Sequence, residues 1–279
     1  MVPTSADLYF AITNGCDNDF EEMLRKKMPL DTVFFQGITL VSYALYKRQN
    51  YILSCLVKAN ANVNIRTRDD KMEPPLFTAC RMNNLAGLQI LLTSPNLDIN
   101  QRDFFNRTAL WASVKYHTYC ATQLLLEHGA AVNIAQCDAE CPLLLALSCA
   151  FQARRQKFSH LLIRHGGILV SDTSRDFALR CMFTTGDRET FRLLILSGFT
   201  VTDRKQLDYH SLPISWQADV ELCQWIKSIQ EAPLPLTHLA KNVIRLTIAT
   251  SRKNIQLRDV NQLQIPHVLK KIIMLEDLL

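Results

Sequence analysis

The sequence has no apolar run long enough to cross a membrane. Its longest apolar stretch runs from about Cys141 to Phe151, whereas a membrane-spanning helix needs about 20 consecutive apolar residues. The N-terminus also lacks the uninterrupted apolar segment of a secretory signal, because Pro3 and Asp7 lie within it. These absences predict a cytoplasmic chain, with the nucleus as a second compartment, and no membrane partner.

Paired cysteines are absent as well. The nine cysteines are an odd number and no two form a CxxC pair, so reduced thiols are expected instead of disulfides. Several His and Cys residues lie near one another, but their spacing matches no standard zinc finger. These residues are His117, Cys120, His128, Cys137 and Cys141. We therefore predict that the chain holds no metal and needs no cofactor.

Motifs of catalytic sites are also missing. The sequence contains no GxGxxG motif, no GxSxG motif, no phosphate loop and no paired-carboxylate site. Each of these patterns places reactive groups or backbone N–H groups at the spacing that its chemistry needs. Their absence predicts that the chain is not an enzyme.

Basic charge is sparse over most of the chain. The net charge is +5, and residues 233–279 hold seven Lys or Arg against three Asp or Glu, so 7 − 3 = +4 lies there and +1 in the first 232 residues. A nucleic-acid-binding protein would carry a denser basic surface on its folded part, so no nucleic-acid partner is predicted. The basic runs at residues 25–27 and 154–157 are expected to be solvated helix ends or turns, with a weak site for an acidic partner as the alternative.

What the sequence does contain is an internal repeat. An apolar residue recurs at spacings of 33, 35, 34, 33 and 36 residues, and a small residue follows it three positions later in every unit except the last, which has Met182. The apolar residues are Leu8, Val41, Leu76, Leu110, Leu143 and Leu179, and the small ones are Ala11, Ala44, Ala79, Ser113 and Ala146. A period of this length predicts a solenoid of stacked helical hairpins.

Helix starts and ends repeat in the same register. A unit typically closes with a leucine pair, a helix-ending glycine and a valine–asparagine pair, as in residues 125–133. A Thr hydroxyl can cap a helix start, Pro suits a first helical turn, and Gly suits the left-handed residue that ends a helix. The residues expected in these roles are Thr39, Thr108, Pro75, Pro142, Gly129, Gly166 and Gly198.

These features resemble the ankyrin repeat. The turn glycine of that family is present at Gly37, and Met72, Asn106, Ala139 and Arg175 stand in its place elsewhere. About four extra residues near 151–157 are expected to lengthen one turn between helices. The resemblance implies an all-α fold, an ankyrin-repeat solenoid of helical hairpins with short turn or hairpin fingers, over residues 1–230 with about six repeats and a degenerate cap.

A second pattern follows the proline-rich residues 233–235. Leu236, Ala240 and Ile244 have the i, i+4, i+8 spacing of one helix face, and the run resembles the elongin-binding box of SOCS-box proteins. Further on, Leu263–Pro266 resembles the cullin-selecting Leu-Pro-x-Pro box, with Gln264 in place of its first proline. The resemblance implies elongin binding by Pro235, Leu236, Leu239, Ala240 and Ile244, and cullin binding by Leu263, Ile265 and Pro266. It also implies a three-helix SOCS-box-like module at residues 231–279.

A repeat array followed by such a box resembles the ankyrin-repeat and SOCS-box family. The resemblance implies a substrate-recognition subunit of a cullin-RING ubiquitin ligase. Its partners would be an elongin B/C heterodimer, a cullin scaffold of the SOCS-box type, cullin five, with its RING subunit, and a protein substrate. One alternative is an ankyrin scaffold or inhibitor that recruits no ligase. In that case the C-terminal helices would be a hydrophobic cap on the last repeat.

Four aromatic residues are candidates for the substrate surface. Phe35, Phe104 and Phe105 fall at turn tips that are usually charged in ankyrin repeats, and Trp111 replaces the histidine of the first helix. Ankyrin arrays generally bind partners with these tips and the adjoining first helices. We therefore predict that these four residues contact the substrate, the alternative being that they pack on one another or on the next tip.

Overall fold

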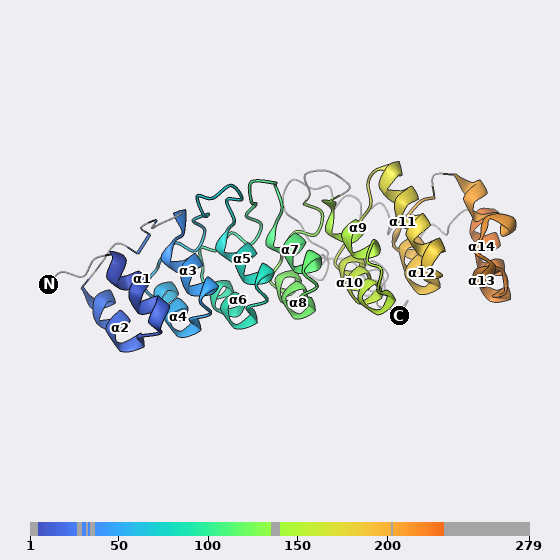
Figure 1. The fold of residues 1–279 in the computed structure, drawn as a ribbon. Helices are drawn as coiled ribbons and strands as arrows, with labels where there is room; N and C mark the ends of the chain where they lie inside the picture. Colours follow the sequence, from blue (N-terminus) through green and yellow to red (C-terminus); the bar gives the residue numbers. More distant parts are fainter. Residues whose placement is uncertain are drawn as a thin grey trace, which may run out of the picture. The chain divides into compact units, whose positions relative to one another are not determined.

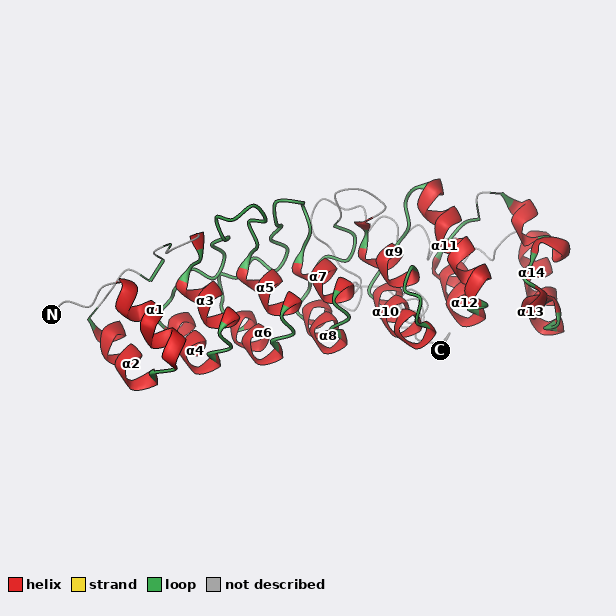
Figure 2. Cartoon of the chain, viewed as in Figure 1, coloured by secondary structure: helices red, strands yellow, loops and turns green. Residues whose placement is uncertain are grey.

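The structure is a computed structural model that describes residues 5–26, 30–31, 33, 37–134, 140–201 and 203–231. The chain divides into two compact units, Met1–Ala130 and Ala131–Leu279, and each is described by itself. Among the described residues the regular structure is helical, with fourteen α-helices, two short 3-10 helices and isolated β-bridges at Val33–Thr39 and Arg102–Thr108 (Figure 2). None of the described helices is long and apolar enough to cross a membrane.

The first unit consists of four helical hairpins. Its helices are α1 (Ser5–Asn14), α2 (Asp17–Arg25), α3 (Leu40–Tyr46), α4 (Asn50–Lys58), α5 (Pro75–Arg81), α6 (Leu85–Leu92), α7 (Ala109–Lys115) and α8 (Tyr119–Glu127). The first helices of the hairpins, α1, α3, α5 and α7, contact one another in sequence and form one row, here called the first-helix row (Figure 1). Helices α2, α4, α6 and α8 form the second-helix row in the same way.

The second unit continues the hairpin pattern. It contains α9 (Pro142–Leu147), α10 (Gln152–Arg164), α11 (Asp172–Thr185), α12 (Arg188–Ser197), η3 (Arg204–Leu207), η4 (Tyr209–Ser211), α13 (Ile214–Gln217) and α14 (Val220–Glu231). Helix α9 packs on α10 and α11, and α10 packs on α12. The last described hairpin, α13 with α14, therefore stands where the degenerate cap is predicted.

The repeat register of the first four units is confirmed by the backbone. The residue that ends each first-helix turn has a left-handed conformation, with φ of +67° at Gly15, +57° at Arg48, +51° at Asn83 and +58° at His117. Their spacings of 33, 35 and 34 residues equal those of the predicted apolar positions Leu8, Val41, Leu76 and Leu110. Those apolar side chains are at most 3% exposed, and full burial of each contributes roughly 1.5–3 kcal/mol.

The predicted helix caps are confirmed as well. The Thr39 hydroxyl oxygen accepts a hydrogen bond from the Ser42 N–H at 3.2 Å, and Thr108 accepts one from Trp111 at 3.3 Å. Pro75 and Pro142 are the first residues of α5 and α9. The left-handed glycines are Gly129, Gly166 and Gly198, with φ of +91°, +91° and +108°.

The repeated asparagine connects one repeat to the next. The Asn64 side-chain amide donates to the Asn96 carbonyl at 2.7 Å and accepts from the Asp98 N–H at 2.9 Å. Asn133 bonds Gly166 and Ile168 in the same way, at 3.0 and 3.1 Å. A side chain that carries both a donor and an acceptor can satisfy two backbone groups of the following loop at once. This explains why the valine–asparagine pair recurs in the sequence.

Two details of the predicted register are wrong in the second unit. Arg175 does not occupy a turn, because Ser171 caps α11 by accepting from the Ser174 N–H at 3.2 Å and the helix starts at Asp172. The extra residues near 151–157 do not lengthen a turn either. Phe151 is the N-cap of α10, and residues 152–157 form the first turns of this helix, which is 13 residues long. Ala139 lies outside the described residues.

A buried ion pair joins α10 to α12. The Arg155 Nε donates to Asp187 Oδ2 at 3.0 Å, and the two side chains are 1% and 0% exposed. Asp187 also accepts from the Gln156 side-chain amide at 2.9 Å and from the Thr190 hydroxyl at 2.9 Å. Burial acts to raise the pKa of Asp187, but hydrogen bonds from Gln156, Arg155 and Thr190 outweigh it and hold the pKa below its ordinary value.

An aromatic cluster holds the last hairpin. Trp216 of α13 is fully buried, and its ring centroid lies 5.1 Å from Phe183 of α11 and 5.0 Å from Phe191 of α12. Trp225 of α14 contacts Phe191 at 6.1 Å. Helix α13 is only four residues long and could not persist alone, so this packing keeps the end of the array in place.

Candidate functional site

The turn before α7 presents two phenylalanines to solvent. Phe104 is 64% exposed and Phe105 is 43% exposed, and their rings meet edge to face with centroids 5.4 Å apart. The turn is closed by Asp103, whose N–H donates to the Arg107 carbonyl at 2.9 Å while its carboxylate accepts from the Arg107 N–H at 2.8 Å. Asn106 supplies the left-handed residue, with φ of +61°. The local sequence thus forces both aromatic side chains outward.

Backbone hydrogen bonds connect neighbouring turns. The Phe104 N–H donates to the Lys71 carbonyl at 3.0 Å, and the Arg68 N–H donates to the Gly37 carbonyl at 3.0 Å. At Gly37, with φ of +76°, an added Cβ would lie 2.6 Å from the Arg68 nitrogen, so only glycine permits this close approach. The exposed phenylalanines therefore sit on a fixed backbone.

Arg107 lies between the exposed and the buried aromatic rings. Its guanidinium carbon is 4.5 Å from the Phe105 ring centroid, 4.5 Å from that of Trp111 and 5.7 Å from that of Phe77. Its Nε and Nη2 donate to Asp103 Oδ2 at 2.9 and 2.6 Å. Cation–π contacts of this kind contribute about 0.5–2 kcal/mol each. We call Phe77, Phe104, Phe105, Arg107 and Trp111 the finger cluster.

Trp111 is the buried member of the cluster. It is 7% exposed and stacks on Phe77, with centroids 6.3 Å apart and planes at 14°. Its indole N–H is buried without a hydrogen-bond partner among the described residues. Of the predicted substrate residues, the structure therefore brings Phe104, Phe105 and Trp111 together but exposes only the two phenylalanines. Phe35 lies outside the described residues, and substrate contact by all four stays a prediction.

Sequence reasoning missed several members of this site. Arg107, Asp103 and Phe77 were not singled out, although an Asp and an Arg four residues apart flank the two phenylalanines in the sequence. That spacing is a usable signal for a closed turn held by an ion pair. Phe77 could have been found from the repeat itself, because it occupies the same helix position as Trp111 in the preceding unit.

Three first helices end in basic residues, of which Lys47 and Lys115 are exposed and Arg81 is half-buried. Lys47, Arg81 and Lys115 lie at or just after the last residues of α3, α5 and α7, and Tyr46 and Tyr116 beside them are 54% and 47% exposed. Trp111 and Lys115, four residues apart, share one face of α7, as Phe77 and Arg81 do on α5. The first-helix row thus carries aromatic rings at its start and cations at its end.

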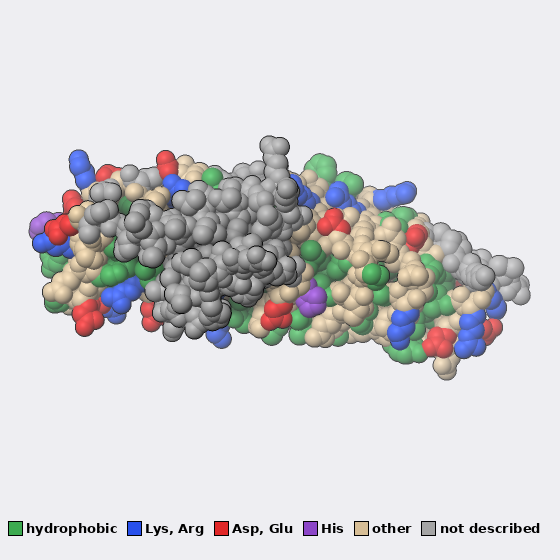
Figure 3. Space-filling view, turned by 180° about the vertical axis from the view of Figure 1, so that it is seen from behind, with side chains coloured by type: hydrophobic (Ala, Val, Ile, Leu, Met, Phe, Trp, Pro, Cys, Tyr) green, Lys and Arg blue, Asp and Glu red, His purple; other side chains and the backbone are tan. Residues whose placement is uncertain are grey.

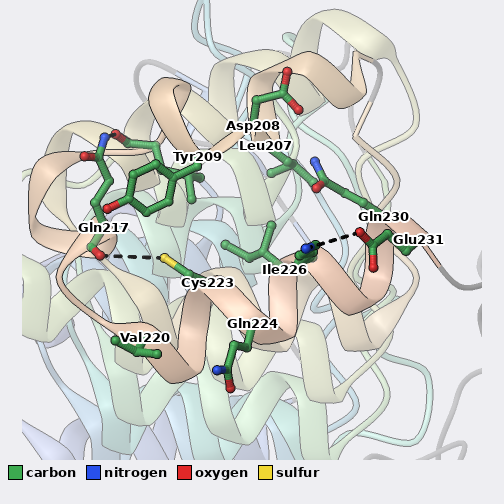
Figure 4. A pocket seen from close by; sticks show the side chains of 12 residues that line it. Leu207, Asp208, Tyr209, Gln217, Val220, Cys223, Gln224, Ile226, Gln230 and Glu231 are labelled. Atoms are coloured by element: carbon green, nitrogen blue, oxygen red, sulfur yellow. Dashed lines mark hydrogen bonds and ion pairs between the residues drawn. The ribbon is translucent and has the colours of Figure 1, made fainter.

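The second unit contains a separate groove between the 3-10 segments and α14 (Figure 4). It has a volume of about 410 Å³, a buried apolar floor of Leu207, Leu212 and Ile226, and an exposed rim that includes Tyr209 and Val220. The charged lining residues are Asp208, Lys227 and Glu231, of which the last two form an ion pair at 3.6 Å. A groove with an apolar floor and a polar rim suits an apolar side chain of a partner or a small apolar ligand.

No group of three His, Cys, Asp or Glu side chains within the described ranges could hold a metal ion. The charges of the described residues are also mixed in sign. On the face drawn in Figure 3, basic and acidic side chains are interspersed, and the described surface there shows no broad field of one sign. The residues predicted to bind elongin (Pro235, Leu236, Leu239, Ala240 and Ile244) and a cullin (Leu263, Ile265 and Pro266) all lie outside the described residues.

Comparisons with known proteins agree with this geometry. No family model matches the chain. It is 41% identical over 69 residues to ankyrin repeat domain-containing protein 29 of Danio rerio, covering 23% of each chain. It is 24% identical over 104 residues to an ankyrin repeat protein of Acanthamoeba polyphaga mimivirus, covering 36% of this chain and 64% of that one. The chain thus spans less than two thirds of the length of either relative.

Solved structures show the same fold. An ankyrin repeat domain from Acinetobacter baumannii AYE matches with a TM-score of 0.63 and 22% identity over 70% of this chain and 99% of that one. The ankyrin repeat domain of Bcl-3, a member of the IkappaB family, matches with a TM-score of 0.58 and 24% identity over 69% and 86%. The described part of the chain is therefore an all-helical ankyrin-repeat array. Such arrays are typically non-enzymatic scaffolds for protein–protein interaction.

We expect replacement of Phe104 and Phe105 by serine to abolish partner capture and to leave thermal stability nearly unchanged. Phe104 is 64% exposed and Phe105 is 43% exposed, so the change removes less buried area than a core substitution and one cation–π contact with Arg107, whereas exposed aromatic anchors often dominate binding energy. Pull-down of interacting proteins and a thermal melt would measure the two effects. Phe151→Ser, at an exposed phenylalanine of the second unit, is the matched control. A large fall in melting temperature would show that the pair serves stability instead.

Proposed function

We propose that this chain is the substrate-recognition subunit of a cullin-RING ubiquitin ligase. The observation that carries the recognition half is the exposed Phe104–Phe105 pair, held on a turn whose backbone bonds to the neighbouring turn at 3.0 Å. A rigid aromatic pair binds a partner at low entropic cost because few torsions must be fixed. The ligase half is supported by the sequence resemblance of residues 235–266 to the elongin and cullin boxes.

In this proposal the chain positions two other proteins. Leu236, Ala240 and Ile244 dock elongin C of the elongin B/C heterodimer, and the segment from Leu263 to Pro266 contacts cullin five with its RING subunit. The array holds the substrate, so its lysines gain a high effective concentration near the conjugating enzyme. The chain acts in the cytoplasm or nucleus, and the chemical step belongs to the other subunits.

Co-purification with elongin B and elongin C tests the ligase half. We expect a stable complex with the full chain and its loss in the double variant Leu236→Asp and Ile244→Asp, because two carboxylates on one helix face cannot be buried without a large penalty. The matched control is Ile214→Asp, since Ile214 is an aliphatic residue 85% exposed on α13. Failure of the unaltered chain to bind elongins would leave the alternative function.

That alternative is an ankyrin scaffold or inhibitor that binds a partner and recruits no ligase. It is supported by the same finger cluster, because the described contacts that hold the exposed phenylalanines lie within the repeats: the two rings contact each other, and the Phe104 N–H bonds the Lys71 carbonyl. Partner capture that depends on Phe104 and Phe105, together with no elongin binding, would be the result expected of it.

A further inference from the structure

We infer that the partner of the first-helix row is an acidic, extended protein segment with one bulky apolar side chain. The apolar side chain would pack on Phe104 and Phe105, and the carboxylates of the segment would pair with Lys47 and Lys115. This inference rests on the proposed protein-binding function and specifies the chemistry of the partner at that same site.

The two rows of the first unit carry opposite charge. The first helices with the two residues after each hold four cations and one carboxylate, which is 4 − 1 = +3: Lys47, Arg48, Arg81, Lys115 and Asp7. The second helices, counted in the same way, hold four cations and five carboxylates, which is 4 − 5 = −1: Arg25, Lys26, Lys27, Lys58, Asp17, Asp19, Glu21, Glu22 and Glu127. The row that carries the finger cluster is therefore the basic one.

The cations of the first-helix row are largely uncompensated. Arg81 pairs with Glu73 at 3.0 Å, and Arg48 donates to the Met82 carbonyl at 2.6 Å. Lys47, whose ammonium lies 5.5 Å from the Tyr43 ring centroid, and Lys115 form no ion pair within the described residues. In the second-helix row, by contrast, Arg25 and Lys26 both pair with carboxylates of α2, as Lys26 does with Glu22 at 3.0 Å. Unpaired cations on one face attract an oppositely charged partner and exclude a basic one.

The helix macrodipole alone does not account for this separation. A cation near a helix C-terminus is favourable in either row, by about 0.3–1 kcal/mol. In the second-helix row, α2 and α4 also end with cations, Arg25 and Lys58, whereas α6 ends without a charge and α8 ends with Glu127. The macrodipole therefore favours terminal cations in both rows. The first-helix row differs in its net charge, and its Lys47 and Lys115 form no ion pair within the described residues, which leaves them available to a bound anionic group.

The dimensions fit a short extended segment. Neighbouring packed helices lie about 10 Å apart, so Lys47 and Lys115, on α3 and α7, are separated by roughly 20 Å across the row. About six extended residues cover that distance at 3.3–3.6 Å each. Along α7, the seven-residue helix rises about 10 Å, which a further three residues span between the finger cluster and Lys115.

The finger cluster offers the apolar end of this site and one more cation. The Phe104 ring stands edge to face on Phe105 at 5.4 Å, and the Arg107 guanidinium lies behind Phe105. Arg107 uses Nε and Nη2 to bind Asp103, and its Nη1 makes no hydrogen bond within the described residues. A carboxylate next to the apolar side chain of the partner would accept from Nη1. The site therefore selects an acidic residue beside a bulky apolar one.

A peptide-display selection on the full chain tests this chemistry. The probe is a library of random peptides of about twelve residues, which is long enough to cover the row. We expect enriched peptides to carry several Asp or Glu and one Phe, Trp, Leu or Met. A synthetic enriched peptide should bind at least about tenfold more tightly than its copy with Lys for each acidic residue, or its copy with Ser for the apolar one. Enrichment of neutral or basic peptides, or no enrichment, would overturn the inference.

Matched variants locate the interaction. Lys47→Glu with Lys115→Glu should weaken the selected peptide at least about tenfold and flatten the dependence of binding on salt, because exposed charge pairs are screened. Arg25→Glu with Lys58→Glu makes the same charge change on the second-helix row and should have little effect. Equal weakening by both pairs, or equally tight binding of a single-stranded oligonucleotide of similar charge, would show that a protein segment is not recognised there.

Failure of this inference can be told apart from failure of the proposed function. Capture of cellular proteins by the unaltered chain and by the Phe104→Ser, Phe105→Ser variant is measured in parallel. Capture that depends on the two phenylalanines, with selected peptides that are not acidic, would reject the partner chemistry and leave the binding function standing. If capture does not depend on the two phenylalanines and the selected peptides are not acidic, both the binding function and the partner chemistry would be rejected.

Discussion

Replacement of Asp187 by alanine is expected to lower the free energy of unfolding by about 3–5 kcal/mol, because it leaves Arg155 buried without its partner. Arg155 is 1% exposed, and its Nη2 already lacks a hydrogen bond within the described residues. The change also removes the cap of α12, whose Thr190 N–H bonds the carboxylate at 3.2 Å. Urea denaturation followed by circular dichroism would measure the loss.

The exposed pair of Asp172 and Arg175 provides the control. Its atoms are 3.1 Å apart, close to the 3.0 Å of the buried pair, but the Asp172 side chain is 74% exposed. A surface pair of this kind contributes about 0–1 kcal/mol, so Asp172→Ala should have a small effect. If Asp187→Ala cost no more than Asp172→Ala, the buried pair would not hold α10 to α12.

The pH dependence of stability should follow the same pair. Because the folded-state pKa of Asp187 lies below its ordinary value of 3.8, the contribution is fully present above that value and is lost as the pH falls through the folded-state pKa. Asp187→Ala should therefore flatten the acid limb of the stability profile below about pH 4. Urea midpoints measured from neutral pH downward would show the difference.

Replacement of Trp216 by alanine should release the last hairpin of the array. A buried Trp→Ala change costs about 3–5 kcal/mol, and here the lost ring contacts Phe183 and Phe191 at 5.1 and 5.0 Å. Because the stability of a repeat array is a sum of neighbour terms, we expect α13 and α14 to open before the rest. Hydrogen exchange would then rise in residues 214–231 and change little in α9.

The variant Trp216→Phe separates the role of the aromatic ring from that of the indole N–H. The indole N–H of Trp216 is buried without a partner among the described residues, so phenylalanine removes an unsatisfied donor while it keeps an aromatic ring in the cluster. Its cost should be much smaller than that of Trp216→Ala. A comparable loss in both variants, spread evenly over the second unit, would mean that the hairpin and the array unfold together.

The sequence alone predicted the ankyrin-repeat fold and the register of the first four units. This prediction succeeded because helix caps and left-handed turns depend on local chemistry. A hydroxyl residue just before a helix can cap it, as Thr39 and Thr108 do. The errors fall in the second unit, where the chain keeps the hairpin but lengthens its helices. Ser171 starts α11 several residues before the expected turn at Arg175, and no periodic signal marked that cap.

The candidate site was only half predictable. Exposure of Phe104 and Phe105 follows from their position in a closed turn, which the repeat register reveals. The burial of Trp111 does not, because it depends on Arg107 lying over its ring at 4.5 Å and on Phe77 from the neighbouring repeat. The repeat spacing places Phe77 opposite Trp111, but it does not show that Arg107 covers both rings. The basic ends of α3, α5 and α7 emerged only once the helices were seen as a row.

The left-handed turns carry a further consequence for engineering. Gly15 and Gly37 occupy two of these positions with φ of +67° and +76°, but Met72 and His117 adopt φ of +47° and +58° with a Cβ present. A left-handed conformation costs such residues roughly 1–2 kcal/mol. Glycine at these two turns would recover part of that strain without altering the finger cluster or the cations beside it. Glycine at these two turns should therefore raise the melting temperature of the array, which would help a laboratory binding reagent built on it.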